Sequence, residues 1–177
     1  AAYIFVTHDH YDHFSPEDIE KVSSENTVLI VPEKMKGKSA EATGNVKEIR
    51  TVRPGVNANV KGLEFDTIPA YNLLKSFHPR EAGWVGYILR VDGKRVYIAG
   101  DTDATKEAKD VHCDIAFIPI GGTYTMDARE ASELINAIHP DIAIPTHYGS
   151  IVGKPSDADA FEELVKAPIK VEKKIQF

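Results

Sequence analysis

The strongest constraint on this chain is a cluster of histidine and aspartate residues that starts directly after an apolar segment. Residues 3–7 are apolar or β-branched and predict a short buried strand. Residues 8–13 then read His-Asp-His-Tyr-Asp-His. Neutral imidazole and carboxylate groups are ligands that suit Zn²⁺, and also Fe or Mn. The string therefore predicts a metal site at the end of the first strand.

The alternating directions of side chains in an extended chain predict which residues of segment 8–13 bind which metal ion. In an extended chain His8 and His10 point in the same direction, so they can bind one ion. Asp12 and His13 come where the chain must turn, and they can face a second ion beside the first. Asp9 lies between His8 and His10 and is expected to hold an imidazole in one tautomer. A His-rich surface loop is the alternative, but such a pattern arises by chance on the order of 10⁻³ times per chain.

Strand and helix patterns alternate along the rest of the chain, which indicates a mixed sheet system with helices outside. Asp92-Gly93 between two apolar runs predicts a hairpin with a type I′ turn. Ser15, Thr125 and Ser156 are expected to cap helices. The predicted helices cover residues 16–24, 126–138 and 156–166, and the predicted strands cover residues 28–31, 46–52, 56–60, 63–68, 84–91, 95–99, 115–119, 142–145 and 169–173.

Further candidate ligands follow the ends of later strands. Asp101 comes directly after the strand at 95–99, and its two carboxylate oxygens could bridge two cations. His147 follows the strand at 142–145 and would point into the same rim. His78, in a loop between two strands, is the candidate third ligand of the first ion, with Asn72 as the competing position. Asp103 is interpreted as a turn aspartate.

Charge and cysteine content exclude several classes of protein. The net charge is −6, which weighs against binding to nucleic acid or to an anionic membrane surface. No apolar run approaches the ~18 residues that a membrane-spanning helix needs. Cys113 is the single cysteine, so no internal disulfide can form, and we expect a core role for it and a cytoplasmic location. His112 and His139 are interpreted as capping or surface residues.

Three motifs together resemble the metal-binding motifs of the metallo-β-lactamase superfamily. They are residues 8–13, Gly-Asp-Thr at 100–102 and Pro-Thr-His-Tyr-Gly at 145–149, in the expected order. Residues 69–72, 78–79, 83–87 and 99–103 look most like the metal-dependent hydrolases near the ascorbate-6-phosphate lactonase group. The resemblance implies an α+β fold, an αββα four-layer sandwich, formed as a single metallo-hydrolase domain over residues 1–177. Family members normally carry several strands before the first motif, so we expect this fold to be incomplete at the N-terminus.

The resemblance also implies a division of the ligands between two metal ions. The first ion would be bound by His8, His10 and His78, the second by Asp12, His13 and His147, with Asp101 between them. The third histidine of the family usually follows a strand directly, where this chain has Tyr71-Asn72, so the choice between His78 and Asn72 stays open. Two Zn²⁺ per chain are expected, with Mn²⁺ or Fe as alternatives.

The expected function is that of a metal-dependent hydrolase, in which a metal-bound hydroxide attacks a small ester, lactone or phosphorylated metabolite. Asp12 would orient the water or carry its proton. Tyr124, Arg80, Tyr148 and Lys75 are loop residues that we expect to meet the substrate.

Three other functions fit the same residues. They are a phosphodiesterase or nuclease, an iron-dependent oxidoreductase, and a non-catalytic metal-binding scaffold. The acidic net charge weighs against a nuclease. The expected partner is a small-molecule substrate, with no nucleic acid and no membrane, and the sequence leaves a homo-oligomer open.

Overall fold

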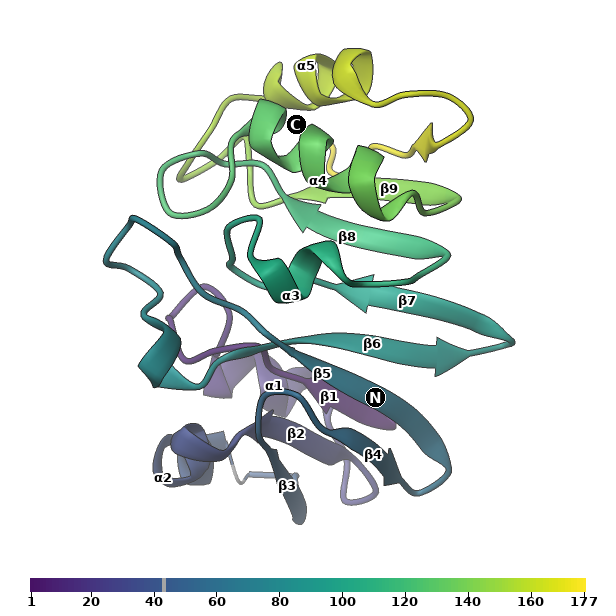
Figure 1. The fold of residues 1–177 in the computed structure, drawn as a ribbon. Helices are drawn as coiled ribbons and strands as arrows, with labels where there is room; N and C mark the ends of the chain where they lie inside the picture. Colours follow the sequence, from purple (N-terminus) through teal and green to yellow (C-terminus); the bar gives the residue numbers. More distant parts are fainter. Residues whose placement is uncertain (43) are drawn as a thin grey trace.

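Two β-sheets form the centre of the computed structural model, which describes residues 1–42 and 44–177 (Figure 1). The smaller sheet is parallel and has the strand order β1 (Tyr3–Phe5), β2 (Val28–Pro32), β3 (Glu48–Val52). The larger sheet has the order β10-β9-β8-β7-β6-β5-β4, antiparallel from β4 to β7 and parallel from β7 to β10. Its strands are β4 (Asn57–Val60), β5 (Leu63–Pro69), β6 (Val85–Val91), β7 (Lys94–Ile98), β8 (Ile115–Pro119), β9 (Ile142–Thr146) and β10 (Lys170–Val171).

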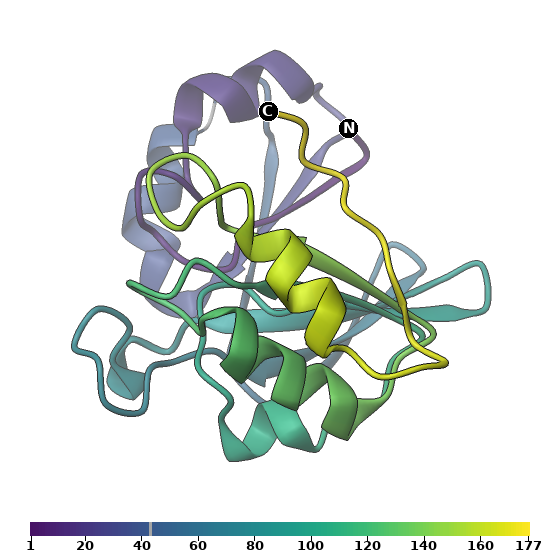
Figure 2. The same ribbon diagram turned by 90° about the horizontal axis from the view of Figure 1, so that it is seen from above.

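Helices cover the outer faces of both sheets (Figure 2). Helices α1 (Pro16–Val22) and α2 (Lys36–Ser39) lie on the side of the small sheet. Helices α3 (Lys106–Lys109), α4 (Ala128–Ile138) and α5 (Asp157–Leu164) lie on the side of the large sheet. Short 3₁₀ turns span Glu33–Met35, Ala40–Ala42 and Arg80–Ala82. This arrangement confirms the predicted αββα sandwich of the metallo-β-lactamase type. Among the described residues, no helix is long and apolar enough to cross a membrane.

Strand β2 shows how the layers are joined. Its side chains alternate between two hydrophobic clusters: Leu29 and Val31 pack toward helix α1, whereas Val28 and Ile30 pack against Phe65 of the large sheet. A strand that is buried on both faces needs apolar residues at successive positions, which explains the unbroken apolar run in the sequence.

The predicted helix starts are confirmed in part. Ser15 caps α1 as expected, because its hydroxyl accepts a hydrogen bond from the backbone N–H of Asp18. The prediction of Thr125 as the cap of α4 is wrong. Thr125 is buried, and Asp127 caps the helix instead, in a capping box with Glu130.

The predicted turn at residues 92–93 is confirmed, whereas the predicted cap at Ser156 is not. Asp92 and Gly93 both have positive φ, at 49° and 73°, as the predicted type I′ turn requires. Ser156 stands at the start of α5 but makes no capping hydrogen bond through its side chain. Helices α2 and α3 were not predicted, because a four-residue helix is too short to show a periodic pattern.

The strand directions bring distant segments to one edge of the molecule. Because β5, β7 and β9 run in the same direction, their carboxyl ends lie at the same edge of the large sheet. Two hydrogen bonds fix the segment after β1 there: Val85 N–H donates to Thr7 O (3.1 Å), and the Tyr87 hydroxyl donates to Val6 O (2.7 Å). All the loops that carry candidate ligands therefore start from this edge.

Replacing Phe65 by alanine tests the core between the sheets. The Phe65 ring is fully buried and packs edge-on against Phe5, with centroids 5.2 Å apart. We expect Phe65→Ala to lower the free energy of unfolding by about 3–5 kcal/mol, measured by urea denaturation. Val91→Ala, at an exposed position of β6, is the control and should change it by no more than about 0.5 kcal/mol. Equal losses in the two variants would contradict a core between the sheets.

Candidate metal centre

Imidazole and carboxylate groups converge where the strand ends meet. The structure groups them in sets of three, and within each set the candidate donor atoms lie within 4.8 Å of one another. The sets are His8, His10 and His78; His8, His13 and Asp101; and Asp12, His13 and His147. Every ligand predicted from the sequence therefore lies in one cluster.

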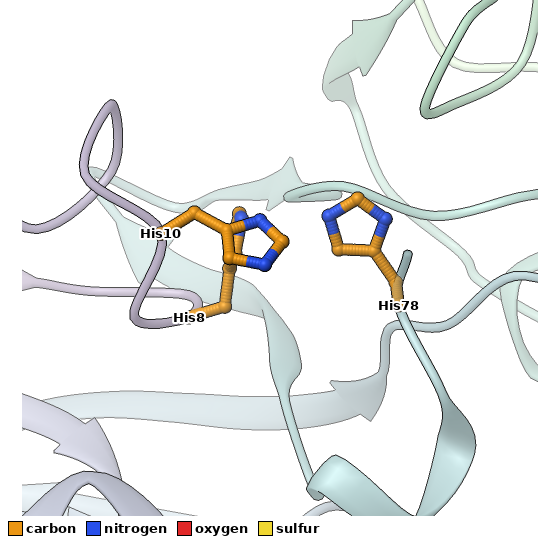
Figure 3. A group of neighbouring side chains, drawn as sticks. All are labelled: His8, His10 and His78. Carbon is orange, nitrogen blue, oxygen red and sulfur yellow. The ribbon is translucent and has the colours of Figure 1, made fainter. Parts of the chain in front are cut away.

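The first set combines two loops. His8 and His10 follow β1, and His78 faces them from the loop between β5 and β6 (Figure 3). The Trp84 ring lies beside all three imidazoles, with centroid distances of 5.2, 4.9 and 5.5 Å. The position of Trp84 against the three histidines was not predicted from the sequence, although Trp84 is the single tryptophan of the chain and follows the His78 loop.

Asn72 fixes the orientation of the His78 ring, so that Nε2 is the nitrogen that faces the other candidate ligands. The amide oxygen of Asn72 accepts a hydrogen bond from the His78 backbone N–H (3.1 Å) and lies 3.0 Å from its Nδ1. Because the amide oxygen can only accept, Nδ1 carries a proton, and in the neutral imidazole this leaves the lone pair on Nε2. That Nε2 lies 3.3 Å from Asp101 Oδ2. Of the two positions considered for the third ligand, the geometry therefore favours His78.

Asp103 fixes Asn72 in turn. Its carboxylate accepts hydrogen bonds from Asn72 Nδ2 (3.1 Å), the Leu73 backbone N–H (2.9 Å) and Lys75 Nζ (2.9 Å). The interpretation of Asp103 as a turn residue agrees with this role, since the carboxylate organises the loop and is not part of the metal-facing sets.

The set of Asp12, His13 and His147 shares no residue with the set of His8, His10 and His78. Asp12 Oδ2 is 3.4 Å from Nε2 of both His13 and His147. The two imidazoles are stacked, with an interplanar angle of 19°. His147 has a φ of 57°, a left-handed conformation that costs about 1–3 kcal/mol for a residue other than glycine and tends to occur at functional sites.

Asp101 is in contact with both sets. Its Oδ1 is 3.3 Å from His13 Nε2, and its Oδ2 is 3.3 Å from His78 Nε2 and 3.1 Å from His147 Nε2. Burial, at 4% exposure, opposes the negative charge, but the hydrogen bond from His147 and the other imidazoles around it outweigh burial and hold the pKa of this carboxyl below its usual range. Asp101 is therefore a carboxylate at neutral pH.

The protonation of the cluster suits a cation. Burial lowers the pKa of His8 to about 2 and also lowers the pKa of His10 and His13, so these imidazoles are neutral and keep a lone pair. Burial lowers the pKa of His147 as well, but the hydrogen bond to Asp101 outweighs it and raises that pKa overall. A cation bound by His147 would compete with a proton for this ring.

Orphaned polar atoms show that the residues present fit a metal. Among the described residues, Nε2 of His8, His13 and His78 and Oδ1 of Asp101 are buried without a hydrogen-bond partner. Leaving one such group unsatisfied costs about 1–3 kcal/mol. Because these atoms are lone-pair donors aimed at a common region, divalent cations would satisfy them together.

A close approach of two loops supports His8 from behind. Thr7 Oγ1 lies 3.0 Å from His8 Nδ1. Gly100 has a φ of 65°, and a Cβ at that position would come within 2.9 Å of the Thr7 Cβ, so only glycine fits there. The prediction that Asp9 holds an imidazole is wrong, because its carboxylate faces Lys38 Nζ at 3.4 Å and Thr7 takes that role.

Of the residues predicted to contact the substrate, the two tyrosines line cavities beside the cluster, whereas Arg80 does not. A cavity of about 300 Å³ opens beside the cluster, and Tyr124 lines it. Tyr148 lines an adjoining cavity of about 250 Å³. Arg80 instead pairs with Glu107 at 2.6 Å, and it lines neither cavity. Substrate contact stays a prediction for the two tyrosines, whereas Arg80 and Lys75 have carboxylate partners outside the cavity.

Comparison with known proteins agrees with this geometry. Residues 1–147 match the family described as "Beta-lactamase superfamily domain". The chain is 34% identical over 171 residues to a UPF0173 metal-dependent hydrolase of Thermoplasma acidophilum, covering 91% of this chain and 71% of that protein. A crystal structure from Parabacteroides distasonis, assigned as a metal-dependent hydrolase, superposes with a TM-score of 0.83 at 31% identity and covers 99% of this chain and 77% of that one.

A more distant structure is similar in fold alone. The metallo-β-lactamase fold protein YhfI of Bacillus subtilis has a TM-score of 0.74 at 11% identity, covering 97% of this chain and 73% of that one. The finer resemblance to the ascorbate-6-phosphate lactonase group stays a prediction, since these relatives do not carry that description.

The Asn72 contact generates a prediction about metal affinity. Removing the acceptor in Asn72→Ala frees the His78 ring to rotate and to change tautomer, and we expect a loss of metal affinity of about 10–100-fold. Titration of the chelator-treated chain with Zn²⁺ in a calorimeter measures it. Asn26→Ala, at an exposed position before β2, is the matched control and should bind as the unaltered chain does. Equal affinities in both variants would show that Asn72 does not position His78.

Proposed function

The chain belongs to the metallo-β-lactamase superfamily, and we propose that it is a metal-dependent hydrolase whose centre binds two divalent cations. The observation that carries the proposal is the Asp101 carboxylate, which contacts imidazoles of both ligand sets. The names of the relatives support the hydrolase class. Since the candidate ligands extend from His8 to His147, we propose one metallo-hydrolase domain over residues 1–177.

The proposed ligand sets follow the geometry of the cluster. One cation would be held by His8, His10 and His78, the other by Asp12, His13 and His147, with Asp101 shared. Nitrogen and oxygen donors of this kind suit Zn²⁺ best, and Mn²⁺ or Fe are the alternatives. When bound, such a pair of cations lowers the pKa of water toward about 7 and polarises the group under attack.

The side chains themselves supply positioning and proton transfer. Asp12 is the ligand candidate with the most exposed carboxylate, and it lines the cavity. We assign it the task of orienting the attacking water and accepting its proton, because a general base must lie within hydrogen-bond reach of the proton. Thr7 and Asn72 hold His8 and His78 in fixed orientations, which keeps the cluster pre-organised. For the substrate we propose a small ester, a lactone or a phosphorylated metabolite.

Loss of single ligands tests the proposal. We expect His10→Ala and Asp101→Ala each to lower metal affinity by more than about 100-fold, beyond what outer partners contribute. Inductively coupled plasma mass spectrometry gives the metal content, and a panel of esters and phosphoesters, with and without EDTA, gives the activity. The unaltered chain should bind two equivalents and lose its turnover in EDTA. His112→Ala is the matched control, because that ring is exposed and faces Asp110 of its own loop.

Two results would contradict the proposal. Unchanged metal content in both ligand variants would remove the metal centre. Stoichiometric metal without turnover of any compound in the panel would indicate a non-catalytic metal-binding scaffold instead.

A further inference from the structure

We infer that the cavity beside the metal-ligand cluster binds an uncharged carboxylic ester or lactone with an apolar substituent, in preference to a phosphorylated compound. The inference rests on the proposed hydrolase function and narrows its substrate class. It is carried by the walls of the cavity and by the positions of the nearby cationic side chains.

The walls of the cavity are apolar and aromatic. Phe77 and Tyr124 meet edge-on, with ring centroids 4.7 Å apart, and both line the cavity together with Tyr11, Ile151 and Val152. Phe77 is 47% exposed and Ile151 is 67% exposed, so apolar surface is in contact with water at the mouth. Exposed apolar surface that gathers around a concave site marks a place where a ligand is buried. An apolar substituent would cover it.

Cationic side chains near the centre are neutralised outside the cavity. Lys75 pairs with Asp103 at 2.9 Å, Arg80 with Glu107 at 2.6 Å, and Lys38 with the carboxylate of Asp9 at 3.4 Å. Of the described residues that line the cavity, none is lysine or arginine.

A phosphoryl group would find little support from these walls. Phosphate is commonly recognised by arginine or lysine side chains, which form short charge-assisted hydrogen bonds to its oxygens. Here the described charged side chains that line the cavity are the carboxylates of Asp12 and Asp101, which are assigned to the cations, so no lysine or arginine in these walls could pair with the phosphate oxygens. A neutral ester requires no such cations, so the walls favour it over a phosphomonoester.

The apolar lining continues into the adjoining cavity. The two cavities share Asp12, His147, Ile151 and Val152. Beyond these, the second is lined by Tyr148 and Phe177, whose rings pack with centroids 5.6 Å apart. Together they offer about 300 and 250 Å³ of space next to the ligand sets, which accommodates an acyl chain or an aromatic group.

The reaction at such a substrate balances without another reactant. The oxygen of water forms a bond to the acyl carbon, and the bond from that carbon to the leaving oxygen breaks with its electron pair remaining on the oxygen. One proton of water goes through Asp12 to the leaving oxygen. The products are a carboxylic acid and an alcohol, joined in one molecule when the substrate is a lactone.

Substrates with one shared chromophore test the inference on the Zn²⁺-loaded chain. We expect kcat/KM to rise from p-nitrophenyl acetate to p-nitrophenyl butanoate by about 10-fold or more, as extra methylenes enter an apolar pocket. The butanoate should also exceed p-nitrophenyl phosphate and bis(p-nitrophenyl) phosphate by at least about 10-fold.

Ile151→Lys places a cation in the cavity wall and removes apolar surface. Because Ile151 is largely exposed, the variant should fold, and we expect its kcat/KM for the butanoate to fall by about 10-fold or more and its preference over the phosphates to shrink. Leu164→Lys is the matched control, since Leu164 is 45% exposed at the end of α5 and lines neither cavity. Its kinetics should equal those of the unaltered chain.

The outcomes separate the two proposals. EDTA-sensitive turnover that favours a phosphate, or that is indifferent to acyl length and to Ile151→Lys, would overturn the inference and leave the hydrolase function standing. Absence of EDTA-sensitive turnover on all of these compounds would overturn the hydrolase function and, with it, the inference.

Discussion

One buried carboxylate connects the parts of the candidate centre. Asp101 is almost excluded from solvent, and burial alone would raise its pKa and neutralise it. The hydrogen bond from His147 opposes burial and helps keep the carboxyl ionised. Asp101 also contacts His13 and His78, and these three histidines come from segments far apart in the sequence. The charge of Asp101 and the lone pairs of the imidazoles are therefore maintained by the same packing, which is what a cation site requires.

The fold supplies that packing through strand direction and close contacts between loops. Strands β5, β7 and β9 end at one edge, and the segment after β1 is held to β6 by two hydrogen bonds. Gly100 lets its loop approach Thr7, which orients His8, while Asp103 and Asn72 orient His78. The orientations of His8 and His78 thus depend on Thr7 and Asn72, which are not themselves candidate ligands in the structure.

This dependence explains what could be predicted from the sequence. The string at 8–13 and the strand-end positions of Asp101 and His147 were readable because strand polarity places such residues at one rim. The role of Asn72 could not be predicted in this way. It depends on Asp103, which is 31 positions away, and on the amide oxygen rather than the amide nitrogen facing His78. The cap of α4 was misplaced by two residues because Thr125 and Asp127 are both good caps and only tertiary burial separates them.

The most direct test of the account is an anomalous-diffraction map from crystals of the chain soaked in Zn²⁺ and collected at the zinc absorption edge. We expect two peaks, one among His8, His10 and His78 and one among Asp12, His13 and His147, with the Asp101 carboxylate adjacent to both. A map without peaks at this cluster, or with peaks only elsewhere on the molecule, would contradict it.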